Sequence, residues 1–174
     1  ERAQKAGVKV RWIQADVLKP PALEPFDLIF DRGCYHGVRR QNAAYWTRAL
    51  EEFEEFLLLP RERPGTRHVW FGYPIVLRRG APFTRKEMQD FLESRAVETR
   101  PIMCGNIAEQ PVLKHFPCRE AGSLPNSRWI MRNGFFFGNH HGIGAPQREA
   151  IAGYFRDFFQ AKGLVGAAKG SASR

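Results

Sequence analysis

Apolar and polar positions along the first part of the chain predict two strands and a helix. Residues 8–14 are rich in β-branched and aromatic side chains, and residues 26–30 are almost continuously apolar, as in the buried strands of a parallel sheet. Each run ends in polar residues, where a strand passes into a loop. Residues 41–56 predict a helix. Its expected inward face consists of Ala44, Tyr45, Ala49, Phe53 and Phe56.

Downstream of this helix the composition changes. A charged, turn-rich stretch at 61–66 leads into a strongly β segment at 68–77. Thr84, with Glu87 three residues later, forms a capping-box pattern, which predicts the start of a helix that ends near residues 94–95. The first division of the chain therefore falls near residues 61–66.

The remaining sequence predicts two strands and a long helix. We expect a short strand at 97–103, a loop at 117–127, a second strand at 128–137 and a helix at 147–162, followed by a mobile tail at 163–174. The inward face of the last helix is expected to consist of Ile151, Tyr154, Phe155, Phe158 and Phe159.

Length and composition limit the class of protein. The chain has 174 residues, 43% hydrophobic and 26% charged, which fit one globular domain or two small ones. No apolar run is long enough to span a bilayer. The chain begins at Glu1 without a signal peptide, so we expect a fragment or a processed product. The three cysteines, Cys34, Cys104 and Cys118, are widely spaced, which argues against a disulfide framework or a zinc site and favours a reducing cytoplasm.

The net charge of +9 is spread over the chain, since residues 1–50 carry +4 of it. Basic residues alternate with acidic and apolar ones, unlike the clustered stripe of a nucleic-acid face. The aromatic run Phe135–Phe137 lies in a predicted strand without a basic groove, so we interpret it as core packing rather than as a stacking platform. These patterns argue against nucleic-acid binding, which stays a third alternative with a steep loss of affinity at raised salt as its signature.

Residues 14–16 and 26–36 resemble the middle of a class I S-adenosylmethionine-dependent methyltransferase, a resemblance that covers about residues 1–50. It implies that Asp16 lies beside the adenine of S-adenosylmethionine and that residues 31–36 border the methyl-transfer cavity. The glycine-rich loop and the second acidic residue of that family would precede this sequence. We therefore expect no complete cofactor site in this part.

From about residue 53 onward, five motifs occur in the order found in the C-terminal small domain of DegT-type, pyridoxal-phosphate-dependent sugar aminotransferases and the related sugar 3-dehydratases. These motifs are Leu59-Pro60-Arg61-Glu62, Trp70-Phe71-Gly72-Tyr73-Pro74, Glu98-Thr99-Arg100-Pro101, Gly105-Asn106-Ile107-Ala108-Glu109-Gln110-Pro111 and Asn126-Ser127-Arg128-Trp129-Ile130-Met131. The sequence of residues 105–111 resembles the same motif in the branch of the family that acts on nucleotide-linked 4-keto-6-deoxy sugars, including the 3-dehydratases.

This second resemblance implies a dimeric fold-type I enzyme that uses pyridoxal phosphate (PLP) as an electron sink. The residues that hold PLP belong to the large domain of such enzymes, so the resemblance assigns none of them here. The small domain covers the mouth of the active site and contacts the substrate, a nucleotide-linked sugar. By their place in the pattern, the candidate substrate-binding residues are Arg100, Asn106, Gln110, Asn139, His140 and His141.

Each candidate also has an ordinary structural interpretation. Arg100 could hold a phosphate through its planar fork of donors, or it could be a surface residue. Asn106 and Gln110 could bind sugar hydroxyls, or they could stabilise turns. His140 and His141 are adjacent and would point to opposite faces, which argues against joint ligation of a metal. One of them could transfer protons to the substrate, or both could be structural.

Together these observations predict an α/β to α+β chain. A partial Rossmann-like strand-helix piece at 1–50 would precede the small α+β domain of a fold-type I PLP enzyme at 51–164 and a flexible tail at 165–174. The function expected is the C-terminal part of a PLP-dependent nucleotide-sugar aminotransferase or 3-dehydratase, without turnover as an isolated chain. The alternatives are a methyltransferase-like protein and a non-catalytic module that binds sugar nucleotides. We expect no catalytic pair of Cys34 and His36, since no third group orients them.

Overall fold

The computed structural model describes residues 34–103, 105–116 and 121–164, together with Gly7, Ala22 and Arg119. The chain divides into two compact units, residues 1–34 and residues 35–174, and the fold described below belongs to the second. The strands expected at 8–14 and 26–30, the cofactor residue Asp16 and the tail from 165 onward lie outside the described residues.

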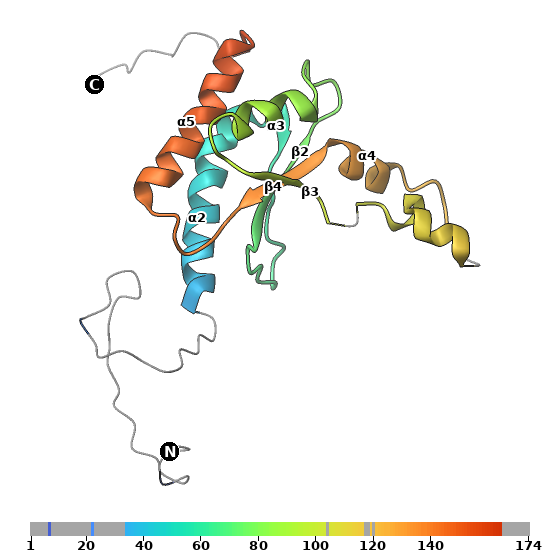
Figure 1. Ribbon diagram of the computed structural model, residues 1–174, viewed down its shortest axis with the longest axis horizontal. Coiled ribbons are helices and arrows are strands. Elements are labelled where there is room, and N and C mark those ends of the chain that lie inside the picture. Colours follow the sequence, from blue (N-terminus) through green and yellow to red (C-terminus); the bar gives the residue numbers. More distant parts are fainter. Residues whose placement is uncertain are drawn as a thin grey trace. The chain divides into compact units, whose positions relative to one another are not determined.

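A four-stranded antiparallel sheet forms the centre of this unit, with the strand order β1-β2-β4-β3 (Figure 1). The strands are β1 Leu57–Leu58, β2 Gly72–Leu77, β3 Thr99–Pro101 and β4 Gly134–Gly138. In the register Ile75 of β2 lies opposite Phe135 of β4, and Phe136 of β4 lies opposite Arg100 of β3. Because side chains alternate along a strand, Phe135 and Phe136 belong to opposite faces of the sheet.

Among the described residues, four helices and three short 3₁₀ segments pack around the sheet. The helices are α2 Cys34–Leu50, α3 Arg85–Glu93, α4 Pro125–Asn133 and α5 Ala145–Ala161, and the 3₁₀ segments are η1 Glu51–Phe53, η2 Ile107–Glu109 and η3 Pro111–His115. Helices α2 and α5 lie side by side, whereas α4 lies toward the other end of the sheet (Figure 1). No helix among the described residues has the length and apolar character needed to cross a membrane.

The core lies between one face of the sheet and helices α2, α3 and α5. The Trp46 ring of α2 meets the rings of Tyr73 and Phe137 edge-on, at centroid distances of 5.6 and 4.8 Å. Phe53 stacks on Phe159 of α5 at 4.1 Å. Burying a side chain such as Trp46 stabilises a fold by about 3 kcal/mol or more. Helix α2 is thus part of the core of this unit.

The inward face predicted for the first helix was partly correct, since Phe53 is buried and Tyr45 and Phe56 pack against the core. The buried positions of α2 include Ala43, Trp46 and Leu50, whereas Ala44 is exposed. The prediction omitted Trp46, and the large apolar area of its indole decides which face turns toward the sheet. The helix also ends at Leu50 instead of 56, and η1 continues the chain.

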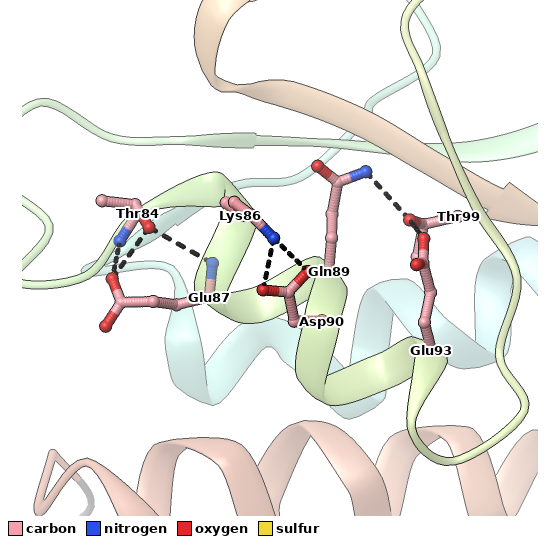
Figure 2. Close-up of polar contacts among 7 residues, drawn as sticks. All are labelled: Thr84, Lys86, Glu87, Gln89, Asp90, Glu93 and Thr99. Atoms are coloured by element: carbon pink, nitrogen blue, oxygen red, sulfur yellow. Dashed lines mark hydrogen bonds and ion pairs between the residues drawn. The ribbon is translucent and has the colours of Figure 1, made fainter.

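The expected start of α3 is confirmed. Thr84 accepts a hydrogen bond from the Glu87 backbone N–H, and the Glu87 carboxylate accepts from the Thr84 N–H at 2.7 Å, which forms the predicted capping box (Figure 2). The last helix, α5, is also confirmed. Ile151, Phe155, Phe158 and Phe159 are buried in it, and Tyr154 is half-buried.

The strand predicted at 128–137 was wrong in its first half, because residues 125–133 form α4 and only 134–138 form β4. Pro125 lies in the first turn of α4, where its missing N–H costs no hydrogen bond. Residues 125–127, which were expected to end the loop at 117–127, therefore belong to the helix. Gly134 ends the helix, and an added Cβ there would lie 2.6 Å from the Ile130 carbonyl oxygen.

Two predicted strands are shorter than expected. The segment 68–77 becomes a strand only at Gly72, because Trp70 has φ of 52° and this left-handed conformation interrupts an extended backbone. The segment 97–103 forms a strand only at 99–101.

Candidate functional site

A cavity of about 540 Å³ lies beside β3, one of the two edge strands of the sheet. Its walls come from the turn between α3 and β3, from β3 and β4, from the loop after β4, and from the first half of α5. The polar and aromatic side chains that line it include Phe71, Arg95, Arg100, Phe136, His140 and Tyr154. A volume in this range suits a small organic ligand.

The turn after α3 sets the direction of the first wall. The Val97 N–H donates to the Leu92 carbonyl at 3.1 Å and the Ala96 N–H donates to the Glu93 carbonyl at 3.0 Å, while Ala96 has φ of 61°. These are the bonds and the left-handed residue of a Schellman motif. They turn the chain sharply, so that Arg95 and Arg100 both reach the cavity.

Side chains of α3 fix the start of β3. The Gln89 amide donates to the Thr99 hydroxyl at 2.9 Å, and this hydroxyl donates to the Glu93 carboxylate at 2.5 Å (Figure 2). Thr99 is buried, so the alternation along β3 turns the next residue, Arg100, outward. The tie to α3 therefore holds Arg100 at the cavity.

Arg100 and His140 are the two predicted site residues that line this cavity. Arg100 is exposed and forms an ion pair with Glu98, two residues earlier. His140 is exposed too, and its Nδ1 accepts a hydrogen bond from the Gly142 N–H at 3.1 Å. A neutral imidazole bound in this way carries its proton on Nε2. It can therefore donate that proton in a hydrogen bond to a ligand.

Asn139 is 1% exposed and its amide is bonded to protein groups. Its Nδ2 donates to the carbonyls of Arg39 and Trp70 at 2.9 and 3.0 Å, and its Oδ1 accepts from Asn42 at 3.3 Å. Asn42 is itself buried and donates to the Ile143 carbonyl at 3.3 Å. The pair thus ties α2 and the chain before β2 to the loop that carries His140.

The other three predicted residues do not line this cavity. Asn106 is 3% exposed; its Oδ1 caps η2 by accepting from the Ala108 N–H at 3.3 Å, and its Nδ2 has no hydrogen-bond partner among the described residues. Gln110 is partly buried between η2 and η3. His141 is exposed beside His140, with the two ring centroids 6.2 Å apart.

Two residues that line the cavity, Arg95 and Phe136, were not among the site residues predicted from the sequence. Arg95 was taken only as the end of a helix, whereas the turn after α3 brings it to the cavity together with Arg100. Phe136 was taken as core, but only Phe135 and Phe137 are buried in the core, and Phe136 faces the cavity half-exposed. In the described parts of the chain, no group of three or more His, Cys, Asp or Glu residues could hold a metal ion.

Residues 35–156 match the DegT/DnrJ/EryC1/StrS aminotransferase family. The lipopolysaccharide biosynthesis protein RfbH of Salmonella typhimurium is 31% identical over 121 residues, which cover 70% of this chain and 28% of that protein. A dTDP-4-dehydro-2,6-dideoxy-D-glucose 3-dehydratase of Saccharopolyspora spinosa is 35% identical over 111 residues, which cover 63% of this chain and 23% of that protein.

Solved structures of related enzymes are similar to this chain as well. The E. coli GDP-4-keto-6-deoxy-D-mannose-3-dehydratase with bound hydrated PLP matches with a TM-score of 0.62 and 27% identity, over 68% of this chain and 30% of that chain. The chain thus spans less than a third of the length of these relatives. The fold expected for the second part of the chain, that of a fold-type I PLP enzyme, is confirmed.

The comparisons do not support the methyltransferase resemblance expected for residues 1–50. The family match begins at residue 35 instead of about residue 53, and it includes α2, which the methyltransferase interpretation had claimed.

The described residues do not supply a site for PLP. Most PLP enzymes bind the cofactor as a Schiff base on a lysine. The described lysines lie elsewhere: Lys86 is paired with Asp90, Lys162 with Glu87, and Lys114 is exposed on η3. None of them lines the cavity, so we derive no catalytic step through PLP from these residues.

Proposed function

Because this chain belongs to the DegT/DnrJ/EryC1/StrS aminotransferase family, we propose that it is the substrate-contacting small domain of a PLP-dependent enzyme that acts on a nucleotide-linked 4-keto-6-deoxy sugar. Dehydration at C3 is favoured over amination, since two of the relatives above are named as 3-dehydratases. The cavity beside β3 carries the proposal, because it combines a cationic fork at Arg100 with a histidine donor at His140.

Arg100 would bind a phosphate oxygen of the nucleotide, since a guanidinium presents two parallel N–H groups to an oxyanion. His140 would donate from Nε2 to a hydroxyl or keto oxygen of the sugar. Asn139 would act indirectly by holding the loop of His140 in place. Asn106, Gln110 and His141 would form a second set of contacts outside this cavity, and the unpartnered amide of Asn106 is the donor that supports this part of the proposal.

PLP would be held by residues outside the described part of the chain. We expect the complete enzyme to work in the cytoplasm as a dimer and the isolated chain to show no turnover. S-adenosylmethionine does not enter the proposal, because the family match leaves no methyltransferase part at residues 35–50.

Isothermal titration calorimetry of the full chain with a GDP-linked and a dTDP-linked 4-keto-6-deoxy sugar tests the proposal. We expect one of the two to bind, and Arg100→Ala to weaken it by about tenfold or more, as for the loss of one charge-assisted contact. Arg61→Ala is the matched control, since Arg61 is 64% exposed, is ion-paired with Glu54 and lies away from this cavity, while Arg100 is 66% exposed.

Failure of both sugars to bind would contradict the proposal, as would equal losses for Arg100→Ala and Arg61→Ala. Binding without release of a dehydrated product, even after addition of PLP, is expected of the isolated chain. Turnover by the isolated chain would contradict the expectation that this chain lacks the residues needed to bind PLP.

A further inference from the structure

A second cavity, of about 290 Å³, lies at the segment that joins β1 to β2. It shares no lining residue with the cavity beside β3. Its walls include three arginines and a histidine that lie close together in the sequence, Arg61, Arg63, Arg67 and His68. A small cavity with this many basic side chains favours an anionic ligand.

Most of the positive charge at this cavity has no counter-charge. Arg63 and Arg67 are exposed, and neither forms an ion pair with a carboxylate of the described residues. Among the described residues of the wall, Glu62 carries the one carboxylate, and it pairs at 3.2 Å with Arg40, which does not line the cavity. Two guanidinium groups therefore remain available to an anion.

The backbone fixes the direction of the His68 ring. Its Nδ1 accepts a hydrogen bond from the Trp70 N–H at 2.8 Å, and the two rings lie 4.6 Å apart. A neutral imidazole bound in this way carries its proton on Nε2, which can donate to a ligand. Trp70 makes this bond with φ of 52°, a strained conformation for a bulky residue and one that is concentrated at functional sites.

Glu62 orders the loop that carries these basic side chains. One oxygen of its carboxylate accepts from the His68 N–H at 2.8 Å, and the other accepts from Arg40. The bond from His68 lowers the pKa of Glu62 most, and the charge of Arg40 lowers it further, so the carboxylate stays ionised at neutral pH. The Thr66 N–H and hydroxyl both donate to the Arg63 carbonyl, at 3.1 and 2.8 Å. These bonds shape the cavity without help from a ligand.

We propose that this cavity binds a phosphate group, with Arg63 and Arg67 as its cationic partners and Nε2–H of His68 as a further donor. Guanidinium groups match the geometry of phosphate oxygens and keep their charge at neutral pH. The ligand is inorganic phosphate or the phosphate of a small ester, since both present the same oxygens. The inference goes beyond the proposed function, because the two cavities share no residue and this site does not require a sugar nucleotide.

Isothermal titration calorimetry of the full chain at fixed ionic strength tests the site, with inorganic phosphate, glycerol 3-phosphate and succinate as probes. We expect the phosphates to bind with a Kd of about 1 mM or lower. Succinate should bind about tenfold more weakly, because each of its carboxylates carries a single charge. Binding of only one of the two phosphates would support the site and identify the free ion or the ester as its ligand. Equal binding of succinate, or no binding of either phosphate, would overturn the inference.

A double variant removes the two free guanidinium groups. Arg63→Ala combined with Arg67→Ala should weaken phosphate binding by about tenfold or more. The matched control combines Arg132→Ala with Arg156→Ala, which removes the same charge from two exposed arginines that do not line this cavity. Equal losses in the two double variants would contradict the proposal, since the effect would then come from net charge alone.

Glu54→Gln gives a gain that a misfolded variant cannot imitate. Glu54 pairs at 2.6 Å with Arg61, the third arginine of the cavity, so its loss frees that guanidinium for the ligand. Phosphate affinity should rise about threefold, and the gain should shrink as salt is raised. His68→Asn keeps an acceptor for the Trp70 N–H but lacks a donor in place of Nε2, so it should weaken phosphate about threefold. Unchanged affinity in both variants would contradict the assigned contacts.

Arg100→Ala separates this site from the proposed function. Arg100 lines the cavity beside β3 and not this one, so its loss should weaken the sugar nucleotide and leave phosphate affinity unchanged. Loss of phosphate binding in Arg100→Ala would place the phosphate beside β3 and overturn the inference. If neither sugar nucleotide binds but phosphate still depends on Arg63 and Arg67, the proposed function fails and this site stands.

Discussion

At the scale of single residues, the hydrogen bonds of Asn139 decide its role more than its place in the sequence does. Its amide satisfies three buried groups, the carbonyls of Arg39 and Trp70 and the Nδ2 of Asn42. A buried polar group that loses its partner costs about 1–3 kcal/mol. We therefore propose that Asn139 holds the loop of His140 in place and does not itself contact the substrate.

Replacement of Asn139 by Ala should therefore act on stability. We expect the free energy of unfolding to fall by about 2–4 kcal/mol, since the carbonyls of Arg39 and Trp70 and the Nδ2 of Asn42 each lose a hydrogen bond. Chemical denaturation followed by circular dichroism measures the change. The control is Asn126→Ala on the exposed face of α4, for which we expect a change of no more than about 0.5 kcal/mol. Wild-type stability together with lost sugar-nucleotide affinity would instead assign Asn139 to the substrate.

At the scale of elements, the side chain of Glu87 holds the N-terminus of α3. Glu87 caps its N-terminus and also pairs with Lys162, the residue that follows α5. The hydrogen bond from Lys162 lowers the pKa of Glu87 most, and the bonds from the Thr84 backbone and hydroxyl lower it further, from an ordinary value near 4.5 to about 2. The ionised carboxylate thus joins two helices.

This pKa shift predicts a pH dependence with a definite sign. Because the pKa of Glu87 is lower in the folded chain, ionised Glu87 stabilises the fold above about pH 4.5, and this contribution is lost as the pH falls toward 2. Thermal scans at pH 6 and pH 3 should therefore show a smaller loss of Tm for Glu87→Gln than for the wild type. Lys162→Gln should remove part of the same dependence. Parallel losses in all three proteins would contradict the prediction.

The elements also show what the sequence could and could not predict. The capping box of α3 and the aromatic face of α5 were predicted because their signals are local. Residues 128–133 were taken for a strand, although Pro125, which suits the first turn of a helix, precedes them. The cavity could not be predicted, because the walls at Arg95 and Phe136 come from separate segments that only the antiparallel pairing of β3 and β4 brings together.

At the scale of the whole molecule, α2 decides where the domain begins. The sequence placed residues 1–50 in a separate piece, but the compact unit and the family match both begin at residue 35. Trp46 packs on Tyr73 and Phe137, and Ala43 and Leu50 are buried in the same core. The free energy of unfolding of an ordinary domain is about 5–15 kcal/mol, and the loss of one buried Trp side chain lowers it by about 3–5 kcal/mol.

Two shortened chains test this boundary. A chain of residues 35–174 keeps α2, so we expect a cooperative thermal transition in circular dichroism. A chain of residues 51–174 lacks Trp46 and exposes the rings of Tyr73 and Phe137, so we expect no cooperative transition and binding of a hydrophobic dye. Trp46→Ala in the full chain is the control, because it removes the indole contacts without shortening the chain. It should also lower Tm. A cooperative transition in the 51–174 chain would move the start of the domain back to residue 51, since the core would then form without α2.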